Sequence, residues 1–224
     1  MSQVDLRTKT SDDWQDQNGN RIVGLPKLLG PAFIEFTGSN NSLTFSSGSS
    51  FAGYMSFRRD DSHVAFGNNA MYRGRMSLGL GCSITFGRGI YWGPNGYITT
   101  AERANITFGD DLLVSENCSV RADDSHPIYN GLTGERINPS KDIVVGSHVW
   151  IGADALLMPG SVVGSGSVLG ARSMVTPSRP VPPNSLVVGS PIRVVRENIY
   201  WVRKHLQSST DIDDSIEPVA MFTR

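Results

Sequence analysis

The sequence predicts an all-β protein, a parallel β-helix built from six-residue repeats. Three observations support this prediction: eight unbroken hexads at residues 145–192, a strand phrase that recurs upstream, and a high content of glycine. The hexads read VGSHVW, IGADAL, LMPGSV, VGSGSV, LGARSM, VTPSRP, VPPNSL and VVGSPI. A fixed six-residue period of this length is the mark of a repeat architecture, and it does not fit the 3.6-residue period of an α-helix.

Each hexad has the same pattern of side-chain size. The first position is aliphatic in all eight hexads: Val145, Ile151, Leu157, Val163, Leu169, Val175, Val181 and Val187. The fifth position is mostly small: Val149, Ala155, Ser161, Ser167, Ser173 and Ser185. Positions five and one lie two residues apart, so both should point into the coil from one short strand. Glycine is frequent at the second position, which suits a tight corner.

The repeat continues toward the N-terminus with less regularity. The phrase SITFG (83–87) recurs as NITFG (105–109), and Trp92-Gly93 follows Phe86-Gly87 at a spacing of six. Aromatic side chains at these interior positions predict wider coils than those of the hexads. We expect a polar N-terminal segment at 1–32, followed by the β-helix at 33–192.

The sixth position of every hexad should face outward, yet it is apolar throughout. It is occupied by Trp150, Leu156, Val162, Val168, Met174, Pro180, Leu186 and Ile192. Contiguous exposed apolar surface marks an interface or a ligand groove. We therefore expect this column to be covered by other subunits, by the C-terminal segment or by both, and we predict a homotrimer.

The C-terminal part divides into two segments. Residues 193–207 place Val195, Ile199, Val202 and Leu206 at helical spacing, which predicts a short amphipathic helix at the end of the coil. Residues 208–224 are acidic and lack periodicity, so they predict a tail.

Charge and composition exclude several classes of function. A net charge of −1 gives no polyelectrolyte signature, so nucleic acid is not expected as a partner. No apolar run approaches the roughly 20 residues of a transmembrane segment, and the polar N-terminus does not resemble a signal peptide. Cys82 and Cys118 form neither a disulfide framework nor a metal-ligand motif. We expect a cytoplasmic protein that holds no metal.

The repeat is interrupted once, at residues 121–141, and this loop contains the residues best suited to catalysis. His126 follows Asp123 and Asp124 in the phrase RADDSH. An imidazole can accept a proton at neutral pH, and a carboxylate on its other nitrogen would fix the tautomer. The residues alone leave open whether His126 is a general base or an ordinary packed loop residue.

The other histidines and one tryptophan have alternative interpretations. His63, in the similar phrase RRDDSH (58–63), is interpreted as an ordinary turn residue, and His205 as a structural residue of the terminal helix. His148 is expected to face solvent, unless a subunit boundary brings it near His126. Trp150 is expected to pack between subunits, to form a wall of the substrate site, or to do both.

The hexads, the phrases SHPIYN and ERIN, and the ending VPPNSLVVGSPIRVVR resemble hexapeptide-repeat acetyltransferases. The loop followed by IVVGSHVWIGADALLMPG is most similar to bacterial sugar and capsular polysaccharide O-acetyltransferases. The resemblance covers about residues 105 to 200. It implies a left-handed β-helix, which is an exception to the usual crossover hand, assembled as a trimer with acetyl-CoA bound between subunits.

The resemblance also implies roles for individual residues. His126 would be the general base and would take the proton of a sugar hydroxyl in a direct transfer. Asp124, which precedes His126 in the loop, is our candidate for the carboxylate that fixes its tautomer. Trp150 would lie beside the reacting centre. The remaining matches assign Gly152, Ala171, Arg179, Arg193 and Arg196 to acetyl-CoA, and Tyr129, Arg136 and Asn138 to the acceptor. The segment VTPSRPVPP has two residues more than the family pattern, which puts the role of Arg179 in doubt.

Three other functions remain open from the sequence. The acetyl acceptor could instead be the amine of a nucleotide sugar or an antibiotic. A zinc hydratase would need His63, His126 and His148 to meet at a subunit boundary. A non-enzymatic scaffold subunit would use the β-helix only for assembly, and the inserted histidine loop argues against it.

Overall fold

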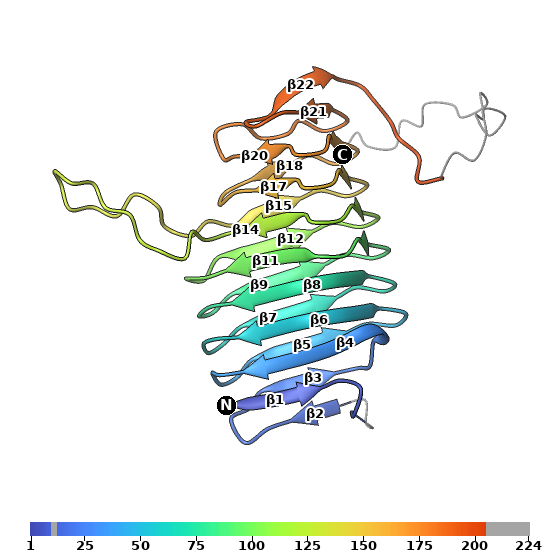
Figure 1. Ribbon diagram of the computed structural model, residues 1–224, viewed down its shortest axis with the longest axis vertical. Helices are drawn as coiled ribbons and strands as arrows, with labels where there is room; N and C mark the ends of the chain where they lie inside the picture. The colour runs from blue at the N-terminus through green and yellow to red at the C-terminus, as the bar shows by residue number, and fades with distance from the viewer. Residues whose placement is uncertain (10–12, 205–224) are drawn as a thin grey trace.

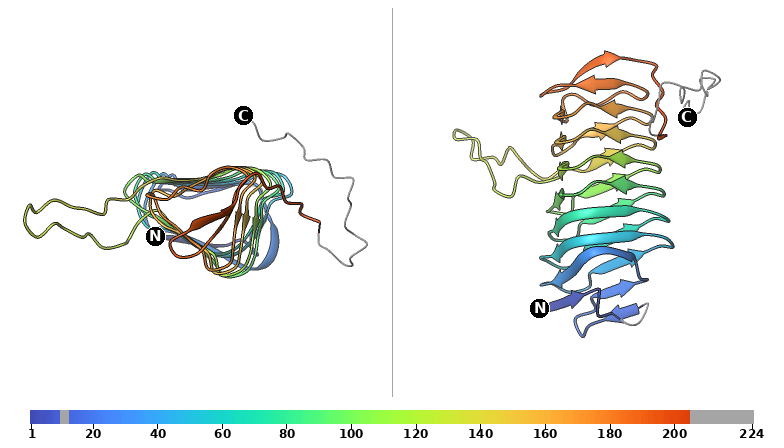
Figure 2. Two further views of the ribbon diagram at one scale, coloured as in Figure 1. Left: turned by 90° about the horizontal axis from the view of Figure 1, so that it is seen from above. Right: turned by 45° about the vertical axis from the view of Figure 1, so that its right-hand side comes forward.

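The computed structural model describes residues 1–9 and 13–204 as a left-handed parallel β-helix of about eight turns. Figure 1 shows the turns stacked along one axis, with β1 near one end and β22 at the other. Seen from above, the coil is triangular (Figure 2). These residues form strands and no helix, so none of them forms a helix able to span a membrane. The prediction of an all-β repeat fold is confirmed.

One sheet forms each face of the triangle. Sheet A comprises β1 (Ser2–Asp5), β4 (Lys27–Phe36), β6 (Ser50–Phe57), β8 (Met71–Leu78), β11 (Gly96–Thr100), β14 (Ser119–Arg121), β17 (Leu156–Leu157) and β20 (Met174–Val175). Sheet B comprises β2 (Asp13–Gln15), β3 (Arg21–Val23), β5 (Ser42–Phe45), β7 (His63–Phe66), β9 (Ser83–Phe86), β12 (Asn105–Phe108), β15 (Ile143–Val145) and β18 (Val162–Val163). Sheet C comprises β10 (Tyr91–Trp92), β13 (Leu113–Val114), β16 (Trp150–Ile151), β19 (Val168–Leu169), β21 (Leu186–Val188) and β22 (Arg193–Arg196). The chain passes from A to B to C, which defines the A/B, B/C and C/A corners.

The turns are wider in the N-terminal half than in the hexad region. Bonded residues on successive turns of the hexad region lie 18 positions apart, as Ser147 and Ser165 do. The spacing is 22 positions between Ser83 and Asn105. The longer turns hold aromatic side chains stacked along the axis, with ring centroids 4.6 and 5.0 Å apart in the series Phe66, Phe86 and Phe108. The wider coils predicted from these aromatics are therefore observed.

The hexad positions have the predicted orientation. All eight first-position side chains are at most 3% exposed, and the small fifth-position residues are buried beside them. The buried hydroxyls of Ser161, Ser167 and Ser185 donate to backbone carbonyl oxygens at 2.7, 2.7 and 3.0 Å, which limits the cost of burying them. The glycines of the second position are required by close approach of the next turn. A Cβ on Gly152 would lie 2.7 Å from the nitrogen of Ala171.

The outward sixth position is only partly exposed. Trp150 and Val162 are 40% and 46% exposed, whereas Leu156, Met174 and Leu186 are half-buried. Two members contradict the prediction: Val168 and Ile192 are 8% and 3% exposed. Ile192 lies in the turn that reverses the chain into β22, so it no longer follows the orientation of the repeat.

Antiparallel strands close both ends of the coil. At the N-terminal end, β1 pairs with β4 and β2 pairs with β3. The coil therefore starts before residue 33: β3 already pairs in parallel with β5. β1 and β3 each bury one side chain, Val4 and Ile22, and β2 buries none, so the segment 1–32 is polar in composition although it folds.

The predicted C-terminal helix at 193–207 is wrong over its described part. Residues Arg193–Arg196 form β22, which pairs antiparallel with β21, and residues 197–204 are irregular. The free edge of β21 offers backbone partners to this β-branched stretch, and Asn198 has a left-handed φ of 54° that a helix would not contain. His205, Leu206 and the tail at 208–224 lie outside the described residues.

Candidate active site

The inserted loop leaves the coil at the A/B corner, between β14 and β15. Figure 1 shows it projecting from the side of the stack as a long arm. Lys141 N donates to Ala122 O at 3.0 Å and closes the neck of the arm. Farther out, Tyr129 and Arg136 form an antiparallel bridge, and Ile137 N donates to Ile128 O at 2.9 Å. The loop is therefore an ordered two-stranded arm.

Glu102, on the turn before the loop, anchors the returning strand of the arm. Its carboxylate accepts hydrogen bonds from the Arg136 guanidinium and from Ser140 Oγ and N, the latter two at 2.8 and 3.1 Å. The Arg136 hydrogen bond, followed by those from Ser140, lowers the pKa of Glu102 to about 2. The sequence assigned Arg136 to the acceptor, whereas the structure gives its side chain this anchoring role.

Replacing Glu102 by glutamine should loosen the arm. Because the folded pKa of Glu102 is depressed from 4.5 to about 2, the anchor is fully present above pH 4.5 and is lost as pH falls through about 2. The pair is partly solvent-exposed, so opening of the arm should increase by only roughly two- to fivefold at neutral pH. Proteolytic nicking within 122–142 measures this, and an unchanged nicking rate in Glu102→Gln would contradict the anchoring role.

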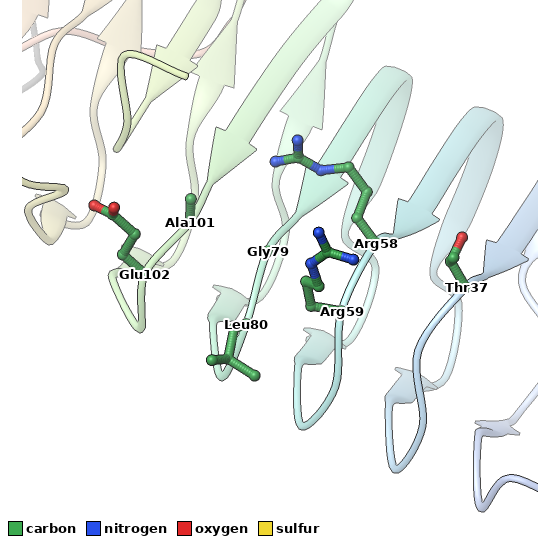
Figure 3. A pocket seen from close by; sticks show the side chains of 7 residues that line it. All are labelled: Thr37, Arg58, Arg59, Gly79, Leu80, Ala101 and Glu102. Carbon is green, nitrogen blue, oxygen red and sulfur yellow. The ribbon is translucent and has the colours of Figure 1, made fainter. Parts of the chain in front are cut away.

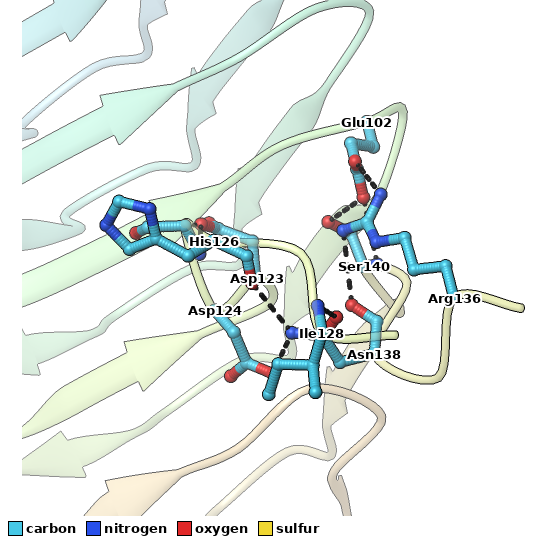
Figure 4. Close-up of polar contacts among 9 residues, drawn as sticks. Glu102, Asp123, Asp124, His126, Ile128, Arg136, Asn138 and Ser140 are labelled. Carbon is cyan, nitrogen blue, oxygen red and sulfur yellow. Dashed lines mark hydrogen bonds and ion pairs between the residues drawn. The ribbon is translucent and has the colours of Figure 1, made fainter. Parts of the chain in front are cut away.

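Asn138 joins the two sides of the arm. Its Nδ2 donates to Asp124 Oδ2 at 3.1 Å and to His126 O at 2.9 Å, and its Oδ1 accepts from Ile128 N at 2.6 Å (Figure 4). All of its amide hydrogen-bonding groups are thus used to hold the segment that carries His126. Asn138 was predicted to bind the acceptor, and its observed contacts are within the loop.

His126 is exposed on the arm, and Figure 4 shows its imidazole pointing away from the Asp124 carboxylate. Among the described residues no hydrogen bond joins the two side chains, so the predicted carboxylate–imidazole pair is not formed within one chain. The buried Asp123 has a different role. Its Oδ1 accepts from Ser125 N at 3.0 Å and stabilises the left-handed φ of 64° at Ser125, directly before His126. The sequence signal for this contact is an Asp two residues before a turn position, since such a side chain caps the backbone N–H that follows it.

Trp150 lies on a different face of the molecule. It projects from β16 of sheet C, and its column continues through Val168 and Leu186 to Arg196 of β22. Arg196 lies three strands along sheet C from Trp150, so the backbone positions of the two residues are about 14 Å apart. An aromatic and aliphatic strip that ends in an arginine thus runs up sheet C.

Other residues assigned to acetyl-CoA lie at or near this strip. Gly152 and Ala171 occupy successive turns at the neighbouring C/A corner, and Arg193 is on β22. Arg179 does not join them. It lies in the tight turn of 176–180 at the A/B corner, where its guanidinium donates to Ile192 O at 3.2 Å.

The C-terminal segment at 197–204 is held against the B/C corner by His148. The two aromatic rings of His148 and Trp201 stack with centroids 4.2 Å apart, and Trp201 Nε1 donates to His148 O at 2.9 Å. His148 Nδ1 lies 2.6 Å from the Asp111 carboxylate. The expectation that His148 faces solvent is therefore wrong: the turn position is covered by the C-terminal segment. The ring centroids of Trp201 and Trp150 are 6.0 Å apart.

His63, His126 and His148, the histidines of the described residues, do not converge within the chain. His63 is on sheet B, where its Nδ1 is bonded to Ser42 Oγ at 2.8 Å, whereas His126 is on the arm and His148 at the B/C corner. In residues 1–9 and 13–204, no group of three or more His, Cys, Asp or Glu side chains is placed to hold a metal ion.

The candidate site residues therefore form two groups. His126, Asp124, Tyr129, Arg136 and Asn138 belong to the arm at the A/B corner, together with Arg179 nearby. Trp150, Gly152, Ala171, Arg193 and Arg196 belong to sheet C and its C/A corner. Figure 2 shows the arm and the C-terminal segment, which contacts Trp150 through Trp201, on opposite sides of the triangle. One chain does not bring the two groups together.

Comparison with known proteins gives relatives along most of the coil. Residues 142–177 match the family model described as bacterial transferase hexapeptide (six repeats). The polysialic acid O-acetyltransferase of Escherichia coli O1:K1 / APEC is 33% identical over 141 residues, 63% of this chain and 45% of that protein. The polysialic acid O-acetyltransferase of Neisseria meningitidis is 38% identical over 120 residues, 54% of this chain and 55% of that protein.

The match to a solved structure is more extensive. The crystal structure of the polySia-specific acetyltransferase NeuO superposes with a TM-score of 0.74 at 30% identity, covering 83% of this chain and 86% of that one. The chain spans about half the length of the two curated relatives described above. The repeat, the fold and these relatives together show that the chain belongs to the hexapeptide-repeat acetyltransferase family, with relatives among bacterial sugar and capsular polysaccharide O-acetyltransferases.

Proposed function

We propose that the protein transfers an acetyl group from acetyl-CoA to a hydroxyl of a surface or capsular polysaccharide, in sites that form between the subunits of a homotrimer. The single observation that carries the proposal is the separation of the two groups of candidate residues. The arm at one corner carries the proposed base but no surface for the acetyl donor. The apolar strip with arginines on another face offers that surface but no base. A cyclic assembly with head-to-tail interfaces would bring the two together.

Sheet B is the face best suited to lie nearest the threefold axis. Its central outward column runs in register from Thr44 through Ala65, Thr85 and Thr107 to Val144 and Val162. These side chains are small and uncharged, and all except Ala65 are β-branched. A flat uncharged sheet face can pack closely against its symmetry copies. In such a trimer the arm of one subunit would reach toward sheet C of the next.

The strip on sheet C fits the chemistry of acetyl-CoA. Trp150, which is 40% exposed, and the half-buried Leu186 offer apolar contacts to the acyl and pantetheine portion, and Arg193 and Arg196 offer charge-assisted donors to phosphates. When bound there, acetyl-CoA supplies a thioester carbonyl that an alcohol oxygen can attack. Arg179 at the A/B corner would approach such a ligand only from the neighbouring subunit.

His126 is proposed as the general base of a direct transfer. Its exposed imidazole accepts the proton of the acceptor hydroxyl, holds it while the oxygen becomes acylated, and returns it to the departing thiolate. A covalent cysteine intermediate is disfavoured, because Cys82 and Cys118 are both buried and burial raises the pKa of the Cys118 thiol to about 11. Asp124 would contact the imidazole only after a rearrangement, so Asp123 and Asn138 are assigned to positioning.

The acceptor is proposed from the relatives, whose names give polysialic acid. A galactoside O-acetyltransferase of Escherichia coli (strain K12) is also 34% identical over 131 residues, so a small sugar is the second candidate. We also propose that the enzyme is cytoplasmic, since the proposed reaction needs a supply of acetyl-CoA.

The test is an acetyl-transfer assay with the purified chain. Release of free CoA thiol is followed with acetyl-CoA and, in turn, polysialic acid, a galactoside and no acceptor, and mass spectrometry detects the acetyl group on the product. The proposal expects acceptor-dependent thiol release with a polysaccharide. Absence of transfer to every sugar, together with absence of acetyl-CoA binding in calorimetry, would favour the non-enzymatic scaffold.

A further inference from the structure

The outward face of sheet A, on the turns before the arm, carries alternating tyrosines and arginines. Tyr54, Arg75 and Tyr97 pair in register on β6, β8 and β11. The Arg75 guanidinium lies 5.8 Å from the Tyr54 ring centroid, and the Arg121 guanidinium, on β14, lies 5.8 Å from that of Tyr97. Arg121 is the last residue before the chain enters the arm that carries His126. The series thus leads across the face to the base of the arm.

A hollow at the A/B corner continues this surface toward the arm. The hollow has a volume of about 500 Å³. Figure 3 shows Arg58 and Arg59 among the residues that line it, together with Leu80 and Glu102. The space exists because the residues stacked on Arg58 in the next two turns are small. They are Gly79, whose N donates to Thr100 O, and Ala101. A Cβ on Gly79 would lie 2.9 Å from the Cα of Ala101, so the space cannot be filled without displacing the next turn.

The arginines of this region have no carboxylate partner. Among the described residues no ion pair involves Arg58, Arg59, Arg75 or Arg121, whereas Arg88 at the B/C corner is paired with Asp110 at 2.7 Å. The nearby carboxylates are already used. Glu35 accepts from Tyr54 Oη and Ser56 Oγ, and Glu102 accepts from the arm. The excess positive charge is therefore local, in a chain whose net charge is −1.

We propose that this arginine–tyrosine face, formed by Tyr54, Arg58, Arg59, Arg75, Tyr97 and Arg121, binds the acceptor as a linear acidic polysaccharide and guides it to His126. The inference rests on the proposed acetyl transfer and adds the location and charge of the acceptor. Guanidinium groups hold carboxylates through paired, charge-assisted hydrogen bonds. Half-exposed tyrosine rings offer the flat apolar surface on which the C–H face of a pyranose packs.

The geometry favours a polymer over a short sugar. Successive turns lie about 4.8 Å apart, so consecutive units of an extended chain can meet consecutive rungs between Tyr54 and Arg121. A neutral galactoside would use the rings and leave the unpaired arginines without a ligand. Single-stranded nucleic acid is the competing occupant, since it also combines negative charge with flat rings.

The test compares Arg75→Gln and Arg121→Gln with the matched control Arg88→Gln, which removes the same charge at the B/C corner. The probes are long-chain polysialic acid, a sialic acid trimer, neutral dextran and single-stranded DNA. Binding is measured by fluorescence anisotropy at two salt concentrations, and acetyl transfer by thiol release. Each sheet A substitution should weaken binding of long polysialic acid by about fivefold, and low salt should enlarge the difference.

In the transfer assay, the KM for long polysialic acid should rise correspondingly, with the KM for acetyl-CoA unchanged. The KM for the sialic acid trisaccharide should rise less, because a short chain meets fewer of the arginines. Equal affinity of the wild-type chain for dextran, tighter binding of DNA, or an equal loss in Arg88→Gln would overturn the assignment of the face. A raised KM for acetyl-CoA would also overturn it, because these arginines would then serve the donor.

The binding and transfer measurements separate this inference from the proposed function. If the chain binds polysialic acid through Arg75 and Arg121 but transfers no acetyl group, the face is correct and the proposed function fails. If it acetylates polysialic acid with the same KM in wild type, Arg75→Gln and Arg121→Gln, the function is correct and the face fails. Circular dichroism and mass measurement of each variant exclude misfolding as the cause of any loss.

Discussion

Replacing His126 by alanine should lower the rate of acetyl transfer by about 10²–10⁴-fold while leaving the subunit assembly intact. The imidazole lies on an exposed arm, outside the coil core, so its removal leaves no cavity. Its segment is held by backbone and Asn138 contacts that do not use the ring. The loss should therefore appear in kcat and not in acetyl-CoA binding, which is measured separately by calorimetry.

The matched control is His63→Ala, which removes an imidazole whose hydrogen bond within residues 1–9 and 13–204 is to Ser42 Oγ on sheet B. This variant should keep its transfer rate. Equal turnover of His126→Ala and wild type would remove the general-base mechanism, and an equal loss in both variants would point to assembly or stability.

Replacing Trp150 by alanine should raise the KM for acetyl-CoA by about tenfold, which corresponds to about 1.4 kcal/mol of lost binding. The indole is 40% exposed in one chain and starts the apolar strip that leads to Arg196. Its truncation removes the largest apolar surface available to the donor. Initial rates at varied acetyl-CoA and constant acceptor measure the effect.

Val162→Ala is the control for Trp150→Ala. Val162 is similarly exposed, at 46%, but lies on sheet B. Its truncation should weaken subunit association and leave the KM for acetyl-CoA unchanged when the protein is concentrated enough to stay assembled. A KM for acetyl-CoA that Trp150→Ala does not change would place the donor elsewhere.

The hexad region could be predicted from the sequence almost residue by residue. Strict alternation of large and small interior side chains leaves one register in which both are buried, and a slip by one residue would turn Leu157 or Leu169 to the outside. The aromatic series through Phe86 and Phe108 likewise predicts wide turns, because these rings do not fit an 18-residue coil.

The C-terminal segment could not be predicted because its partners are distant in sequence. Val195, Ile199 and Val202 have helical spacing, but β21 offers an open edge and His148 offers a ring for Trp201 to stack on. Tertiary contacts outweigh a weak local preference for helix. The hydropathy pattern does not show that an edge is open.

The candidate site was only partly predictable for a related reason. The inserted loop identified His126, and the resemblance identified Trp150. The sequence did not reveal that Glu102 and Asp123 hold the arm, because each acts through a contact that depends on the folded turn. It also did not reveal that the two groups of site residues lie on different faces of one chain.

That separation is tested most directly by mixing subunits. His126→Ala and Trp150→Ala chains with different affinity tags are co-expressed, and trimers containing both are isolated and assayed at an acetyl-CoA concentration too low for Trp150→Ala to work efficiently. If each site takes His126 from one subunit and Trp150 from its neighbour, every isolated mixed trimer contains one complete site, which is about one third of its sites. The account predicts activity well above that of either parent. Mixed trimers no more active than the parental variants would show that both residues must come from the same chain, and would contradict the intersubunit site.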